Sequence, residues 1–279
     1  VMFPKTSYPN CSINLMHHKP SFRRYSIFSK VHNFKHNFSS IPEKSFSSGV
    51  SSGALSHKKA FTFDANGVLY KRNLKAIARL ESVLSSARND GHMTTEPKPH
   101  QLEELKKLRY SADIGSISKD KYYDTILDLY GIKSSQKRDE LKTKLKEADG
   151  QVILYDGVVT TLQKLHQSGY KLGVVTNTIS STDEKLYWLK QAGLNITWDA
   201  FVSSSEVGHK KPHAAIYQAA LTRLQVSPQD AVFVGHEQEE TDGAKAVGMS
   251  TVLVHANAGA TADYVLNNFS ELLHLVRVG

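Results

Sequence analysis

Residues 61–70, with the sequence FTFDANGVLY, join an apolar run of the kind found in β-strands to a single carboxylate, Asp64, and then to a glycine, Gly67. Glycine permits the backbone angles of a tight turn. The segment therefore predicts a strand that presents Asp64 at its end, where a carboxylate can attack an electrophile and form a covalent intermediate. The alternative interpretation is a carboxylate that only caps the turn after the strand.

The chain is long enough to bury a sizeable core, with 279 residues of which 40% are hydrophobic and 22% are charged. Its only cysteine, Cys11, lies in the N-terminal segment. The body of the chain therefore has no disulfide framework, no thiolate metal site and no cysteine nucleophile. Its chemistry has to come from carboxylates, hydroxyls, lysine and histidine.

Strands and helices alternate after residue 150. Apolar runs predict buried strands at 171–176, 200–202, 231–234 and 250–254. Helices are predicted from Val158 to about Gly169, from the capping box of Ser181 and Glu184 to Gly193, and from Pro212 through Ile216 to Leu224. This alternation predicts an α/β fold, a parallel sheet covered by helices on both faces.

Ligands of such sheets bind beyond the carboxyl ends of the strands. Four residues fall at or just after predicted strand ends, namely Asp64, Thr176, Lys211 and His236. We therefore expect their side chains to meet in one crevice.

Residues 73–149 interrupt this pattern with leucines and other apolar residues that recur at steps of three and four, which indicates helices. Breaks at Gly91, at Pro97 and Pro99, at Gly115 and at Gly131 divide the segment. The pattern predicts an insertion of four helices.

The first 60 residues hold nine of the 35 basic residues and one of the 27 acidic residues, so 26 of each remain in the rest of the chain. A serine-rich, basic segment with few acids is typical of an organelle transit peptide, and a basic tail is the alternative. We expect residues 1–58 to be a disordered targeting segment and linker, and the mature protein to reside in the mitochondrial matrix.

The confinement of the basic excess to one end argues against nucleic-acid binding. No apolar run of 18 residues occurs, so no membrane span is expected either.

Four segments, FDANGVL, LGVVTN, KKPHAAIY and VFVGH with GAKAVGM, resemble in order the four motifs of the haloacid dehalogenase (HAD) superfamily over about residues 60–258. The resemblance implies a Rossmann-like three-layer α/β core formed by residues 59–72 and 150–279, with residues 73–149 as a helical cap. It also implies a hydrolase of the phosphatase type with magnesium as cofactor and a small anionic metabolite as substrate.

The resemblance also implies roles for individual residues. Asp64 would be the covalent nucleophile, Thr176 would hydrogen-bond the transferred group, and Lys211 would neutralise its charge. Asn177 and Gly67 would contact the substrate. The simpler interpretations are that Thr176 ends a strand and that Lys211 is a solvated lysine before a proline.

Two positions depart from the phosphatase motifs. Phosphatases of this superfamily carry an aspartate two residues after the nucleophile, which acts as general acid and base, but this sequence has Asn66 there. An amide exchanges no proton at neutral pH. The loss of general acid and base catalysis costs a factor of about 10² to 10⁴ in rate. At the position of the metal-binding aspartate this sequence has His236, whereas magnesium prefers oxygen ligands. Asp64, the backbone carbonyl of Asn66 and the carboxylate of Glu240 remain available as ligands.

These departures leave three functions open. The first is a phosphatase-like hydrolase with weak or lost activity. The second is a pseudoenzyme that binds a protein partner. The third is a metal-independent dehalogenase, because dehalogenases of the same superfamily also carry a non-acidic side chain at the position of Asn66. In that case Arg72 or Arg79 would hold the halide.

Overall fold

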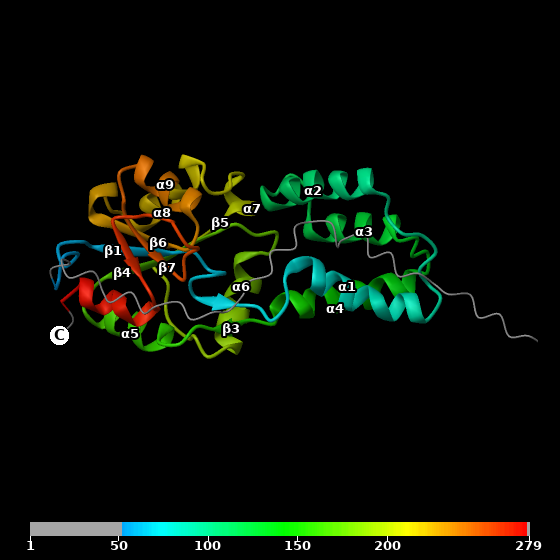
Figure 1. Ribbon diagram of the computed structural model, residues 1–279, viewed down its shortest axis with the longest axis horizontal. Coiled ribbons are helices and arrows are strands. Elements are labelled where there is room, and N and C mark those ends of the chain that lie inside the picture. Colours follow the sequence, from blue (N-terminus) through cyan, green and yellow to red (C-terminus); the bar gives the residue numbers. More distant parts are fainter. Residues whose placement is uncertain (1–51, 278–279) are drawn as a thin grey trace, which may run out of the picture. The chain divides into compact units, whose positions relative to one another are not determined.

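The computed structural model describes residues 52–277, and Figure 1 shows their helices and strands. Most of the predicted targeting segment and linker lies outside these residues and stays a prediction. None of the described helices is both long and apolar enough to cross a membrane.

The central sheet of the described residues is parallel, as the alternating pattern predicts, and has six strands. Their order is β5-β4-β1-β6-β7-β8. Their bounds are β1 Ala60–Phe63, β4 Lys171–Thr176, β5 Ala200–Ser203, β6 Ala231–Gly235, β7 Ser250–Val254 and β8 Tyr264–Leu266. Phe63 of β1 pairs with Val174 of β4 and with Val234 of β6, so β1 lies in the middle of the sheet between the other two motif-bearing strands.

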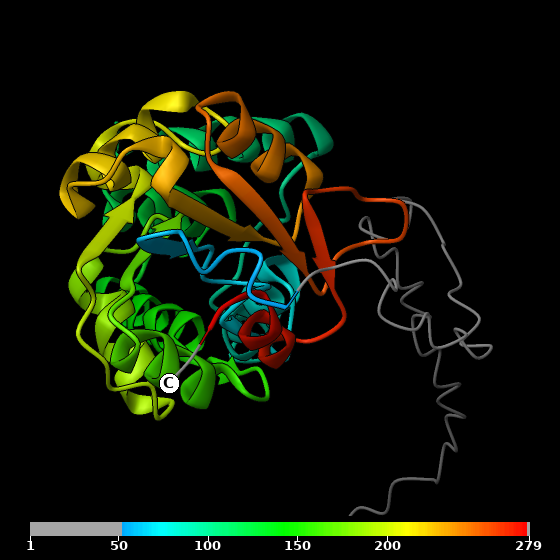
Figure 2. The same cartoon turned by 90° about the vertical axis from the view of Figure 1, so that its left-hand side faces the viewer.

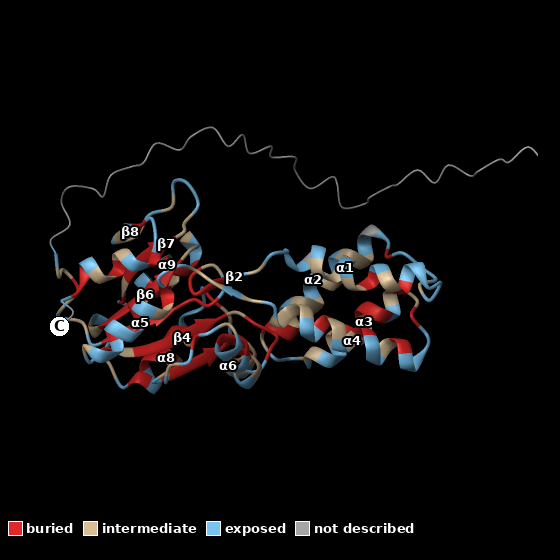
Figure 3. Cartoon of the chain, turned by 90° about the horizontal axis from the view of Figure 1, so that it is seen from below, coloured by how far each residue is buried: buried red, intermediate tan, exposed pale blue. Residues whose placement is uncertain are grey.

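Helices cover both faces of this sheet (Figure 2). On one face, Phe61 and Phe63 pack with residues of α5 (Val158–Gln167), of α6 (Thr182–Gln191) and of the 3-10 helix η3 (Phe269–Leu275). On the other face, Val175 and Phe233 pack with α8 (Ala214–Leu224) and α9 (Gln238–Ala246). Because both faces are covered, β1, β4 and β6 are almost wholly buried. Figure 3 labels β4 and β6 and colours buried residues red.

Four helices occupy the predicted insertion, with bounds α1 Ala76–Asn89, α2 Pro99–Asp113, α3 Lys119–Leu129 and α4 Ser135–Gly150. Their inward side chains, Leu84, Ile126, Leu127 and Leu141 among them, form a hydrophobic cluster of their own. A short antiparallel ladder of β2 (Tyr70–Lys71) and β3 (Ile153–Leu154) joins the point where the chain leaves the sheet to the point where it returns.

The linker boundary predicted at residue 58 is wrong for the part that the structure describes. Leu55 is buried in the main core, and its backbone N–H donates to the carbonyl of Leu275. A large apolar side chain in a serine- and glycine-rich stretch was the signal for this anchoring, since its burial removes apolar surface from water.

The helix predicted to open at Pro212 begins at Ala214 instead. The side chain of His213 caps it by accepting a hydrogen bond from the backbone N–H of Ala215 at 3.2 Å. The structure also contains elements that the hydrophobic patterns do not indicate. Most of them are too short to show a period. They are β2, β3, α7 (Ser204–Val207), η2 (Pro228–Asp230), α9, β8 and η3.

Candidate active site

The nucleophile candidate and the histidine lie at the ends of adjacent strands. Asp64 directly follows β1, and its backbone N–H donates to the carbonyl of Val234 at 2.9 Å. His236 directly follows β6, and Glu240 lies one helical turn further on, in α9. The edge of the sheet therefore brings three titratable side chains together.

Lys211 reaches this edge from the loop before α8 and is only 2% exposed. Its Nζ lies 2.5 Å from Asp64 Oδ1 and 2.8 Å from Glu240 Oε1. Burial lowers the pKa of Lys211, but the two carboxylates outweigh it and raise the pKa above its ordinary value. The ammonium group is therefore a fixed positive charge beside the nucleophile candidate, and the interpretation of a solvated lysine is wrong.

Asn177 has a structural contact besides the substrate role expected for it. Its Oδ1 accepts a hydrogen bond from the backbone N–H of Lys211 at 2.8 Å, and its Nδ2 donates to the carbonyl of Lys211 at 3.3 Å. This pair of bonds holds the loop that carries the lysine against the end of β4.

The ring of His236 occupies the space next to the second oxygen of Asp64. Its Nδ1 lies 3.2 Å from Asp64 Oδ2 and 3.6 Å from Glu240 Oε2, and it makes no well-aligned hydrogen bond to either. Burial lowers the pKa of His236, but the nearby carboxylates raise it above its ordinary value, which favours the imidazolium. Both oxygens of Asp64 thus face a cationic group.

This environment shifts the pKa values of Asp64 and Glu240 in opposite directions. Burial would raise the pKa of Asp64, but Lys211 and His236 outweigh it and lower the pKa to about 2. Burial raises the pKa of Glu240 to about 7, and the charge of Asp64 adds to the effect. At neutral pH, Asp64 is ionised, whereas Glu240 is near the midpoint of its titration.

The residues do not fit the magnesium ion that the family resemblance implies. Asp64, His236 and Glu240 offer three atoms within 4.8 Å of one another, but one of the three is an imidazole nitrogen. Magnesium requires oxygen ligands in near-octahedral geometry. In addition, the ammonium of Lys211 already binds one oxygen of each carboxylate.

Thr176 lies at the same edge of the sheet, at the end of β4, and is buried. Strand order places Thr176 near the cluster, and within residues 52–277 its hydroxyl makes no hydrogen bond to the cluster.

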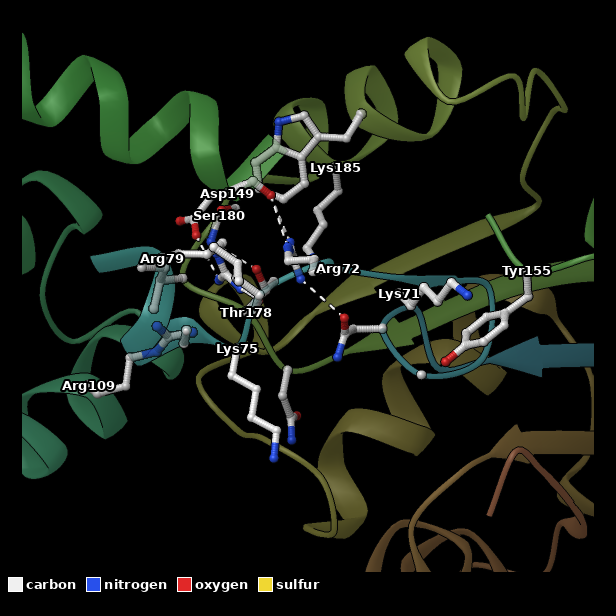
Figure 4. A pocket seen from close by; sticks show the side chains of 17 residues that line it. Lys71, Arg72, Lys75, Arg79, Arg109, Asp149, Tyr155, Thr178, Ser180 and Lys185 are labelled. Atoms are coloured by element: carbon white, nitrogen blue, oxygen red, sulfur yellow. Dashed lines mark hydrogen bonds and ion pairs between the residues drawn. The ribbon is translucent and has the colours of Figure 1, made fainter. Parts of the chain in front are cut away.

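A cavity of about 430 Å³ opens where the insertion meets this edge of the sheet (Figure 4). Three residues predicted near the substrate, Asn66, Gly67 and Asn177, line it, whereas Asp64, Thr176, Lys211 and His236 do not. The charged side chains of its wall are Lys71, Arg72, Lys75, Arg79, Arg109 and Lys185, with Asp149 as the one carboxylate. Such a wall favours a small anionic ligand.

Asn66 is turned towards this cavity. Its Oδ1 accepts a hydrogen bond from Arg72 Nη1 at 3.3 Å. Both arginines considered for halide binding line the cavity, but protein groups hold them: Arg72 donates to the carbonyl of Asp149, and Arg79 forms an ion pair of 3.0 Å with its carboxylate.

Sequence reasoning missed Lys185, although a signal was present. Lys185 lies on the buried face of α6 with Trp188 and Leu189, at helical spacings of three and four. A lysine on the apolar face of a helix needs a polar partner and therefore marks a candidate site.

The haloacid dehalogenase-like hydrolase family matches residues 62–254 of the chain. The pyrophosphatase PpaX of Bacillus velezensis is 30% identical over 162 residues, which cover 56% of this chain and 69% of that protein. The glyceraldehyde 3-phosphate phosphatase of Methanothermobacter thermautotrophicus is 37% identical over 117 residues, which cover 41% of this chain and 50% of that protein.

A crystal structure of 2-haloacid dehalogenase from Pseudomonas syringae pv. Tomato DC3000 shares the fold. Its TM-score is 0.62 at 23% identity, and the match covers 78% of this chain and 97% of that chain. The match over residues 62–254 includes Asp64, the loop of Lys211 and the turn of His236. The chain belongs to the haloacid dehalogenase-like hydrolase family.

Proposed function

We propose that this protein is a slow hydrolase of a small phosphorylated metabolite, with Asp64 as the group that accepts the phosphoryl group. One observation carries the proposal: an ionised, buried carboxylate lies between Lys211 and His236, and Asn66 and Gly67 of the turn that follows it line a cavity with a basic wall. The phosphatase names of two relatives support the choice of a phosphate substrate.

In the first step, an oxygen of Asp64 attacks phosphorus, and the bond from phosphorus to the leaving oxygen breaks with its electron pair. Water then attacks the aspartyl phosphate, which releases phosphate and restores the carboxylate. The positive charges of Lys211 and His236 lie where they can offset the negative charge of the transferred group. The hydroxyl of Thr176 is available to donate to it.

Proton transfer is the weak part of this site. The leaving oxygen needs a proton in the first step, and the attacking water loses one in the second. The amide of Asn66 can do neither, so solvent has to supply and remove these protons. We therefore expect slow turnover of ordinary phosphate esters.

A second candidate is a binding module without turnover. It is favoured by the contacts of Asp64, because both of its oxygens already face cationic groups that reduce its nucleophilicity. In that case the basic cavity binds an anionic ligand, and binding itself is the function.

The test is hydrolysis of a panel of phosphomonoesters by the full chain, with added magnesium and with a chelator. We expect measurable turnover that the chelator does not abolish, and a loss of about 10³-fold or more in Asp64→Asn. The matched control is Asp230→Asn, which removes an exposed ion pair with Lys59 near the opposite end of β1 and should leave turnover unchanged. Turnover that persists in Asp64→Asn, or is absent from the unaltered protein, would overturn the proposal.

A further inference from the structure

Two cations in the wall of the cavity are at least partly buried and have no carboxylate partner within the described part of the chain. Lys185 is only 3% exposed, and its Nζ donates to the hydroxyl of Tyr70 at 2.7 Å. Arg72 donates to the carbonyl of Asp149 at 3.1 and 2.9 Å and to the amide of Asn66 at 3.3 Å. Both positive charges are therefore hydrogen-bonded to neutral groups only.

The same two aromatic rings hold both cations. The guanidinium of Arg72 lies 5.1 Å from the ring centre of Tyr70 and 5.6 Å from that of Trp188. The ammonium of Lys185 lies 5.4 Å and 5.6 Å from the same centres. Figure 4 shows the Lys185 side chain extending towards Arg72. Ring faces attract cations only weakly compared with a carboxylate, so this arrangement positions two charges without neutralising them.

Other cations of this wall are compensated or exposed. Arg79 pairs with Asp149, and Arg109 pairs with Asp113 at 3.0 Å. Lys71 and Lys75 are exposed to solvent. Lys185 is buried and Arg72 is half-buried. A cation that is withdrawn from water without an anionic partner costs folding free energy, so its retention beside a cavity indicates an anionic ligand.

We propose that Arg72 and Lys185 form a second anion subsite, which binds a charged group of the substrate other than the phosphoryl group that Asp64 accepts. This inference rests on the proposed function. Asn66 connects the nucleophile candidate to this subsite, because it lies two residues after Asp64 and its amide oxygen accepts a hydrogen bond from Arg72. The substrate is then a small molecule with two anionic groups, either two phosphates or a phosphate and a carboxylate.

The test measures binding by calorimetry, without reference to turnover. Its probes are inorganic phosphate, which has one anionic group, and pyrophosphate and 3-phosphoglycerate, which have two. We expect the full chain to bind at least one two-group probe about 10-fold or more tightly than phosphate, as a charge-assisted contact implies. The probe that binds more tightly identifies the second group as phosphate or carboxylate.

The variants Lys185→Met and Arg72→Gln should each remove most of this preference while phosphate affinity changes less than about 3-fold. Arg72→Lys should keep part of it. The matched control, Lys164→Gln, removes an exposed lysine of α5 away from the cavity and should keep all of it. Thermal melting checks folding, and Arg72→Gln carries the test should Lys185→Met not fold.

Equal affinity of the unaltered protein for one-group and two-group probes would overturn the subsite, as would variants that weaken all probes equally. These outcomes are separate from a failure of the proposed function. Absent turnover with the binding preference intact removes the hydrolase and leaves the subsite. Turnover without the preference removes the subsite and leaves the hydrolase.

Discussion

At the scale of single residues, the proposed hydrolase depends on Asn66 for its choice of substrates. The amide occupies the position from which a carboxylic acid would protonate the leaving oxygen, and it faces Arg72 at 3.3 Å. A leaving group that is stable as an anion needs no proton, whereas an alkoxide does. The site should therefore discriminate among phosphate esters by the acidity of the departing alcohol.

We predict that Asn66→Asp accelerates hydrolysis of alkyl phosphates by about 10² and hydrolysis of p-nitrophenyl phosphate much less, because only the former needs an acid. The low end of the usual range is expected, since Arg72 would pair with the new carboxylate and keep it ionised. The measurement is the ratio of kcat/KM for the two substrates. Asn66→Ala, which introduces no acid, is the control, and an equal gain for both substrates would contradict the argument.

At the scale of elements, the turn between β1 and β2 has to leave room for the ring of His236. Gly67 has a φ of +96°, and a Cβ added there would lie 2.5 Å from His236 Nε2. The absence of a side chain at Gly67 therefore serves the turn geometry and lets the imidazole lie beside Asp64.

We predict that Gly67→Ala lowers the free energy of unfolding by more than the ~1–2 kcal/mol that a left-handed backbone costs a non-glycine residue. The ring has to move, so the pKa of His236, measured by NMR titration, should fall towards its ordinary value. Gly169→Ala is the matched control, because Gly169 has a φ of +85° and open space around its Cβ position. It should show the backbone cost alone, and a His236 pKa that is unchanged in Gly67→Ala would contradict the prediction.

At the scale of the whole molecule, three segments of the chain contribute to one largely buried charge cluster: Asp64, Lys211, and His236 with Glu240. The pKa of Glu240 is raised to about 7 by burial and by Asp64, so the folded protein keeps a proton that the unfolded chain loses above about 4.5. The raised pKa of His236 acts in the same direction at higher pH. The lowered pKa of Asp64 acts in the opposite direction, below pH 3.8.

We predict that the free energy of unfolding decreases as pH rises from about 4.5 to about 7, with a contribution from Glu240 of up to ~1.4 kcal/mol per pH unit. Glu240→Gln should remove that contribution and flatten the curve in this window. Urea unfolding at a series of pH values measures the free energy of unfolding of the unaltered protein and of the variant. The control is Glu239→Gln, which alters the exposed neighbour and should keep the slope of the free energy of unfolding against pH. Identical slopes for the unaltered protein and Glu240→Gln would exclude this role of Glu240.

The sequence by itself determined the parallel sheet, the four-helix insertion and the arrival of Asp64, Thr176, Lys211 and His236 at one edge. These follow from local periodicity and from the rule that parallel strands end together. Only the tertiary structure decided that Lys211 bridges Asp64 and Glu240, that the ring of His236 lies on Gly67, and that Lys185 and Arg72 share two aromatic rings. Most of these contacts join residues more than 100 positions apart, and their distances depend on how packed elements meet, which no local pattern records.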